Sequence, residues 1–286
     1  MRKIRRTNNG QPLILTVGFS FLSDRGCCWM DFHLTIVGLL VGFLVGLTGV
    51  GGAALLTPIL IFLGISPTVA VGTDLVYNSI TKIFGTWQHW RQKTVHFSIV
   101  LYLAIGSIPS AIAAVNVMNW IHLHVAGADQ IFKRILGFAL ILIPIAMLVK
   151  SLLDRRNPQL NRWQQMPIVQ KRSMLIVLGA ILGFLVGLTS IGSGSLFAIA
   201  LMHFFTLSGK EVVGTDIAHA FFLTSAAGLA HMSFGTVDFL TVVQLLLGSV
   251  PGVLAGSMLS CKVPTIWLKC VISVVIIISG IKIIQI

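Results

Sequence analysis

Charged residues are scarce in this 286-residue sequence: Asp, Glu, Lys and Arg make up only 10% of it, and just 8 residues are acidic. A soluble domain of ordinary composition carries about 25% charged residues. The chain therefore lacks the polar surface that a water-soluble protein needs. Because 56% of its residues are hydrophobic, the composition is that of a membrane protein instead.

Motifs for metal, disulfide or catalytic chemistry are also missing. The four cysteines, Cys27, Cys28, Cys261 and Cys270, have neither metal-ligand nor redox spacing. The sequence contains no Walker motif, no His-Glu-x-x-His and no Gly-x-Ser-Gly. We therefore expect no enzyme: no catalytic residues, no metal, no cofactor and no step driven by ATP.

Long apolar runs fill the chain from residue 33 onward. A bilayer core of about 30 Å takes about 20 helical residues to cross, and continuous apolar runs favour helices over barrel strands. We predict an all-α polytopic membrane protein of about eight transmembrane helices. The candidate segments are 33–65, 67–89, 95–115, 133–153, 173–206, 209–232, 237–259 and 265–286.

The net charge of +12 comes from basic residues in short connections between these segments, such as Arg91, Lys93 and the stretch 154–172. No zinc-finger or recognition-helix pattern accompanies them, so we expect no nucleic acid as a partner. Juxtamembrane Lys and Arg are typical of cytoplasmic loops. The partners that we expect are the lipid bilayer and a small substrate, and a homo-oligomer stays open.

The first 30 residues form a leader that fits the rest poorly. The basic start is followed by a short apolar stretch, as in a signal peptide, but no small-residue cleavage site follows. Met30 leads directly into the first long apolar segment. The leader is therefore an element that the native protein could lack.

The sequence is duplicated. The phrase "GFLVGLT" occurs at 42–48 and at 183–189, and "VGTD" occurs at 71–74 and 213–216, followed in each copy by matching Val-x-Phe and Gly-Ser-x-Pro motifs. Such internal repeats are typical of transporters, whose substrate site lies at the repeat interface near the bilayer midplane. We predict a leader at 1–30, a first membrane repeat at 31–153, a basic linker at 154–172 and a second repeat at 173–286.

Each glycine-rich phrase has two parts. Gly42 and Gly183 each begin a small-xxx-small pattern, which predicts close packing between helices. The glycines and serines that follow break the helix, and the helix that restarts presents free N–H groups, which favour an anion. The predicted substrate-binding residues here are Thr48, Gly49, Gly51, Gly52, Thr189, Ser190, Gly192 and Ser193.

The segment after each break carries polar residues within the membrane. Asp74, Asn78 and Lys82 recur every four residues and so share one helix face. Such residues usually face the protein interior. We predict that Lys82 neutralises Asp74 and helps to hold the anion, whereas Asp216 has no lysine at its matching position and exchanges a proton. The remaining candidates are Thr73, Thr215 and Asn78 for substrate binding, and Asp74, Asp216, His89 and His231 for proton coupling. A ladder that only holds helices together is the alternative.

With its duplicated glycine motifs, the Gly-Thr segment and the His-bearing helix end before "VHF", the chain resembles the TauE/SafE family of sulfite and organosulfonate exporters over residues 36–286. The resemblance implies a carrier of the bacterial inner membrane that exports a small sulfur-containing anion. The family motif matches at Gly49, Gly51 and Gly52, and more loosely at 190–194. One departure is that Asp74 and Asp216 stand where the family usually has serine, which leaves a different ion open.

Two further alternatives stay open at this stage. The polar residues cluster on two helices, which favours a gradient-driven transporter over an anion or cation channel. Each glycine-broken segment either crosses the membrane once or forms a re-entrant hairpin. The length of 33–65, about 50 Å as a straight helix, favours the hairpin.

Overall fold

The computed structural model describes residues 32–48, 53–156, 164, 168–194, 196–260 and 265–285. Throughout these residues the chain is helical, with short connections and no strand. The leader, the first glycine break at 49–52 and most of the linker lie outside the described residues, so the predictions about them stay predictions.

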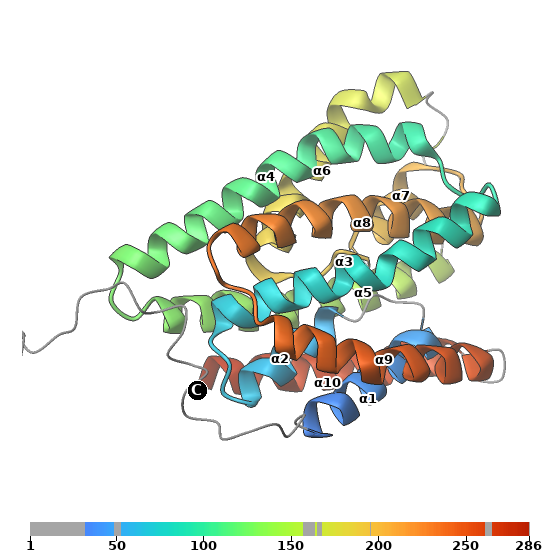
Figure 1. Cartoon of the computed structure of the whole chain (residues 1–286). Coiled ribbons are helices and arrows are strands. Elements are labelled where there is room, and N and C mark those ends of the chain that lie inside the picture. Colours follow the sequence, from blue (N-terminus) through green and yellow to red (C-terminus); the bar gives the residue numbers. More distant parts are fainter. Residues whose placement is uncertain are drawn as a thin grey trace, which may run out of the picture.

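The helices follow the apolar segments closely (Figure 1). The N-terminal half contains α1 (Phe32–Thr48), α2 (Ala53–Phe62), α3 (Pro67–Arg91), α4 (Phe97–His124) and α5 (Ala128–Arg156). The 3-10 helix η2 (Ile168–Lys171) precedes the C-terminal half, which contains α6 (Arg172–Thr189), α7 (Leu196–Phe204), α8 (Gly209–Ser233), α9 (Phe239–Ser260) and α10 (Thr265–Gln285).

Among the described residues, α4, α6, α8 and the Phe239–Gly256 part of α9 are long and apolar enough to cross a membrane. His33–Val45 and Ser273–Gln285 form shorter apolar helices. Large apolar side chains cover the outside of the bundle: on α9, Leu240, Leu247 and Leu254 recur every seven residues and are all more than half exposed. A helix with such a face needs lipid around it. The fold is therefore that of a polytopic membrane protein, and the count of about eight crossings stays a prediction.

The second glycine break ends α6 through its backbone conformation. Ser190 has φ 59° and Gly192 has φ 91°, a region in which a helix cannot continue. After the break, α7 returns toward the start of α6. This return is shown by a hydrogen bond of 2.9 Å that Lys171 Nζ, just before α6, donates to the carbonyl of Phe204 at the end of α7. Residues 171–204 thus begin and end on the same side, which agrees with the re-entrant alternative for this half.

Glycines bring the two halves into close contact. A Cβ added to Gly42 on α1 would lie 2.7 Å from the Cα of Ser249 on α9, and one added to Gly183 on α6 would lie 2.5 Å from the Cα of Ser107 on α4. Since real Cβ atoms do not approach this closely, only glycine fits at these positions. The prediction that the "GFLVGLT" phrases serve close helix packing is confirmed for these two glycines.

The halves are interleaved as a result. Helix α1 packs on α9, α6 packs on α4, and α3 packs on α8 between these two pairs (Figure 1). Helix α5 packs on α10. Two of the α3 residues that were predicted to bind substrate, Thr73 and Lys82, therefore contact the C-terminal half.

Candidate functional site

The polar row on α3 is buried, as the sequence predicted, and Asp74 is its most tightly held member. Asp74 Oδ1 accepts a hydrogen bond of 2.6 Å from Asn78 Nδ2, and Asp74 Oδ2 accepts one of 2.6 Å from Thr57 Oγ1 on α2. Because carboxylate acceptors form strong hydrogen bonds in a low-dielectric interior, these contacts fix the Asp74 side chain.

The third member of the row, Lys82, reaches the other half of the chain. Its Nζ donates a hydrogen bond of 2.9 Å to Ser193 Oγ in the second glycine break. Lys82 is only 8% exposed and Ser193 only 1%. A buried ammonium group is thus joined directly to the interrupted helix for which we predicted anion binding.

Asp216 on α8 approaches the same lysine. Lys82 lies close enough to interact electrostatically with both buried aspartates, Asp216 as well as Asp74. The sequence analysis assigned Lys82 to Asp74 because both lie on α3. That assignment missed the packing of α3 against α8, which brings the lysine to the aspartate of the opposite half. Within the part of the chain that the structure describes, Asp216 Oδ1 is buried and has no hydrogen-bond partner.

Two residues outside the predicted site complete this cluster. Ser107 Oγ on α4 and His219 Nε2 on α8 are 2.8 Å apart, and the His219 ring lies 4.2 Å from the Phe197 ring on α7, centroid to centroid. His219 also interacts electrostatically with Lys82. The polar groups therefore come from α2, α3, α4, α8 and the break, and the expectation that they cluster on only two helices was wrong.

Thr73 and Thr215 were predicted to bind substrate, but their hydroxyls are used between the halves. Thr73 Oγ1 accepts a 3.1 Å hydrogen bond from the backbone N–H of Asp238, and Thr215 Oγ1 accepts one of 3.1 Å from the N–H of His96. The two threonines are 142 positions apart, as are their two partners. Each half therefore supplies a threonine hydroxyl that accepts a hydrogen bond from the backbone of the other half.

His89 and His231 also form a matched pair, at the ends of α3 and α8. His89 Nδ1 lies 2.9 Å from Thr94 Oγ1, and His231 Nδ1 lies 2.8 Å from Thr236 Oγ1. Each histidine stands 15 positions after its aspartate, which is about 22 Å along a helix. The structure thus holds both rings at helix ends and does not bring them to Asp74 or Asp216.

The other predicted site residues fall into two groups. Ser190 and Gly192 shape the second break with Ser193, and the Thr189 hydroxyl donates to the carbonyl of Leu185 at 2.7 Å. The first break, with Gly49, Gly51 and Gly52, lies outside the described residues, as does the side chain of Thr48.

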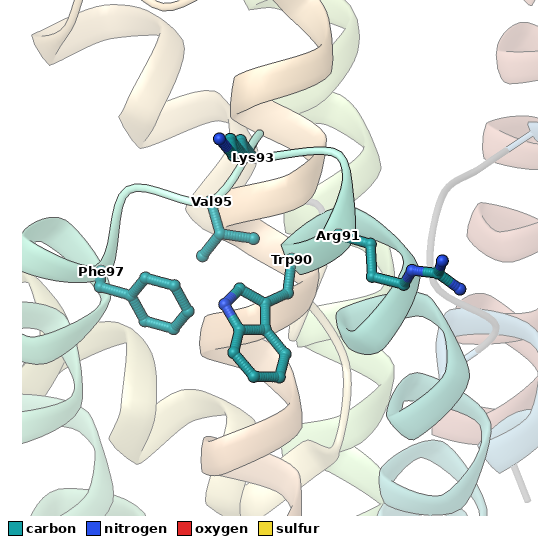
Figure 2. A pocket seen from close by; sticks show the side chains of 5 residues that line it. All are labelled: Trp90, Arg91, Lys93, Val95 and Phe97. Carbon is teal, nitrogen blue, oxygen red and sulfur yellow. The ribbon is translucent and has the colours of Figure 1, made fainter.

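A surface pocket of about 450 Å³ lies apart from the buried cluster, where α3 connects to α4. Figure 2 shows the rings of Trp90 and Phe97 below Val95, with Lys93 above them and Arg91 pointing away. The Arg91 guanidinium lies 5.0 Å from the centre of the Trp87 ring. Exposed tryptophans beside basic residues are typical of the membrane–water interface.

Sequence reasoning missed Thr57 and Ser107, and it left His219, one turn from Asp216, out of the predicted site. Thr57 is a lone hydroxyl next to Pro58 in an apolar helix, and Ser107 belongs to a Gly-Ser-x-Pro motif that occurs in both halves. Both signals were visible in the sequence, but neither says which residue each side chain meets. Thr57 meets Asp74 in the same half, and Ser107 meets His219 in the opposite half.

An apolar helical bundle that buries a lysine beside an interrupted helix is the architecture of a polytopic membrane transporter. Residues 34–283 match the family described as sulfite exporter TauE/SafE, and the chain belongs to this family. The resemblance noted in the sequence is thereby confirmed, and the protein is a membrane transporter.

Relatives carry names that agree with this class. The probable membrane transporter protein YjnA of Bacillus subtilis (strain 168) is 53% identical over 255 residues, covering 89% of this chain and 100% of that protein. The probable membrane transporter protein YunE of the same organism is 26% identical over 268 residues, covering 88% and 96%. The probable membrane transporter protein MJ0441 of Methanocaldococcus jannaschii is 32% identical over 168 residues, covering 56% and 57%. No solved structure matches the chain.

Proposed function

We propose that this protein is a secondary transporter that exports a small sulfur-containing anion, sulfite or an organosulfonate, across the inner membrane of a bacterium. The observation that carries the proposal is the hydrogen bond between Lys82 Nζ and Ser193 Oγ. It joins a buried positive charge on α3 to the glycine break of the other half. The membership of the chain in a family of sulfite exporters supports the same substrate class.

The chemistry of this contact favours an anion. The Ser193 hydroxyl accepts its hydrogen bond from the lysine, so its own proton is available to an oxygen of the substrate. Helix α7 begins three residues after Ser193, and the positive end of its dipole faces the break. A hydrated anion can exchange its water for these groups without leaving a charge unpaired.

We also propose that the two halves are structural repeats that move against each other. The repeat interpretation is supported by contacts that recur at an offset of 142 residues, among them the Thr73–Asp238 and Thr215–His96 hydrogen bonds. In such transporters, access alternates by rocking of one repeat against the other around a fixed site. Lys82 and Ser193 lie on opposite halves, so this motion would open and close their contact.

Proton coupling is assigned to Asp216. Its Oδ1 atom is buried without a hydrogen-bond partner, and Lys82 is its electrostatic neighbour. A carboxyl group in this position can bind a proton when Lys82 is occupied by the substrate anion, and can release it when the anion leaves. A proton and an anion would then cross in the same direction, so the outward gradient of the substrate drives export.

Purified protein in proteoliposomes tests this function. Counterflow of labelled sulfite, sulfate and methanesulfonate should be measured at two pH values, because counterflow requires a carrier that binds its substrate on both sides. We expect saturable counterflow of sulfite or methanesulfonate. Flux of these anions without counterflow would indicate a channel, and the absence of any flux would refute the substrate class.

A further inference from the structure

His219 holds an unused polar atom inside the candidate site. The residue is fully buried, its Nε2 lies 2.8 Å from Ser107 Oγ, and its ring packs on Phe197. The other ring nitrogen, Nδ1, is buried and has no hydrogen-bond partner among the described residues. Buried polar atoms are nearly always paired, so an unpaired one beside a buried lysine calls for a ligand.

The 2.8 Å contact between Ser107 Oγ and His219 Nε2 fits either ring tautomer, because a hydroxyl can donate or accept; we take Ser107 as the donor. The Ser107 hydroxyl makes its hydrogen bond with His219. A buried hydroxyl donates its proton when an acceptor is in reach. A second positive charge next to Lys82 is unfavourable, so the ring is neutral. If Nε2 accepts from Ser107, then Nδ1 carries the hydrogen and is a donor.

The equivalent position in the first half shows that packing does not require a histidine here. Tyr77 stands 142 positions before His219, and Ser249 stands 142 positions after Ser107. Tyr77 lies beside Ser249 just as His219 lies beside Ser107. In the first half, the phenol of Tyr77 therefore takes the place beside the serine. The imidazole in the other half adds a second polar atom, which the serine does not use.

We propose that His219 Nδ1 is a third donor of the anion site, and that Ser107 positions the ring for this role. This inference rests on the proposed function. Lys82 Nζ bonds to Ser193 Oγ in the second break, and the His219 ring packs on Phe197, four residues after Ser193, so the three donors come from α3, the break and α8. Three donors fit a group in which three oxygens surround one sulfur. The substrate class is therefore a sulfonate or sulfite, and a sulfinate, with two oxygens, leaves one donor unused.

A pair of substitutions separates the two ring nitrogens. His219→Gln keeps an amide near the Nε2 position and so keeps the contact with Ser107, whereas His219→Asn keeps an amide near the Nδ1 position. Half-saturating concentrations for counterflow of methanesulfonate and methanesulfinate should be measured with the full-length protein in proteoliposomes. Thermal unfolding of each variant controls for folding.

We expect the wild-type protein to prefer methanesulfonate by about ten-fold, the value of one hydrogen bond to a charged group. His219→Gln should reduce this preference to nearly one, and His219→Asn should retain most of it. Ser107→Ala should lower the preference in part, because the ring loses its orientation. The ratio is taken within one variant, so loss of folded protein does not change it.

A His219→Gln variant that keeps the wild-type preference would overturn the assignment of Nδ1, even if transport itself is intact. If the wild-type protein moves methanesulfonate and methanesulfinate equally well, the three-donor site is wrong while the proposed function stands. If the wild-type protein transports none of methanesulfonate, methanesulfinate and sulfite, the proposed function is wrong, and the assignment of His219 that rests on it is wrong as well.

Discussion

Asp74 and Asp216 stand at the same place in the two "VGTD" motifs, yet hydrogen bonds satisfy both carboxylate oxygens only in Asp74. Asn78 and Thr57 each donate to one oxygen of Asp74 at 2.6 Å, whereas Asp216 Oδ1 is buried without a partner. The two equivalent aspartates therefore lie in different hydrogen-bonding environments. We interpret Asp74 as a fixed structural charge and Asp216 as the group that changes its protonation during transport.

Asp216→Asn tests the assignment of Asp216. The amide keeps the shape of the carboxyl group but cannot exchange a proton. We expect substrate counterflow within about two-fold of wild type and no stimulation by an imposed pH gradient. A variant that keeps its full response to the gradient would show that Asp216 does not carry the coupling.

Asp74→Asn tests the structural role of the other aspartate. An amide in place of the carboxylate presents its NH2 either to Asn78, where a buried hydrogen bond is lost, or to Thr57, whose hydroxyl must then accept and gives up its bond to a carboxylate. We expect a loss of about 1–3 kcal/mol in stability, seen as a lower unfolding temperature in detergent. If instead Asp74→Asn unfolds like wild type but loses its response to the pH gradient, the two roles are reversed.

Gly192→Leu tests the second glycine break. Gly192 has φ 91°, and a Cβ added there would lie 2.7 Å from Leu196 Cδ1, so a side chain both strains the backbone and fills the break. We expect an inserted protein without transport in proteoliposomes.

Gly235 offers a matched control for this substitution. Its φ is 68°, but nothing lies within 4 Å of an added Cβ. Gly235→Leu therefore carries the backbone strain alone, about 1–2 kcal/mol, and should retain transport. If Gly192→Leu transports as well as Gly235→Leu, the second break is not part of the substrate site.

Much of this arrangement follows from local patterns in the sequence. The four-residue spacing of Asp74, Asn78 and Lys82 predicted one buried face on α3, and the glycine phrases predicted close helix contacts. Both are local properties of a helix, so no knowledge of the other half is needed. For the same reason the order of the elements and the end of α6 at the second break could be read from the sequence.

The partners of these residues could not be predicted, because they depend on how the halves interleave. Lys82 contacts Ser193, and lies near Asp216, because α3 packs against the second half; Ser107 contacts His219 because α4 lies against α8. Without knowledge of how the halves pack, we predicted that Thr73 and Thr215 bind substrate. Their contacts cross between the halves and involve backbone N–H groups that no side-chain motif reveals.

Thr73→Val and Thr215→Val test these contacts between the halves. Valine keeps the shape of threonine but leaves the N–H of Asp238 or His96 without its acceptor. We expect each variant to lose about 1–3 kcal/mol of stability in thermal unfolding, with an unchanged half-saturating concentration of substrate. A higher half-saturating concentration at unchanged stability would restore the prediction that these threonines bind substrate.

The central claim is that Lys82 binds the transported anion, and it is tested most directly by comparing wild-type protein with Lys82→Met. Methionine keeps most of the length of the side chain and removes the charge, while Lys93, a basic residue in the connection after α3, provides a control as Lys93→Met. The measurement is the half-saturating concentration for counterflow of labelled sulfite in proteoliposomes, with thermal unfolding as the check on folding. Our account predicts an increase of at least about ten-fold for Lys82→Met, the effect of losing one charge-assisted contact, and no change for Lys93→Met. A folded Lys82→Met variant with the wild-type value would contradict the account.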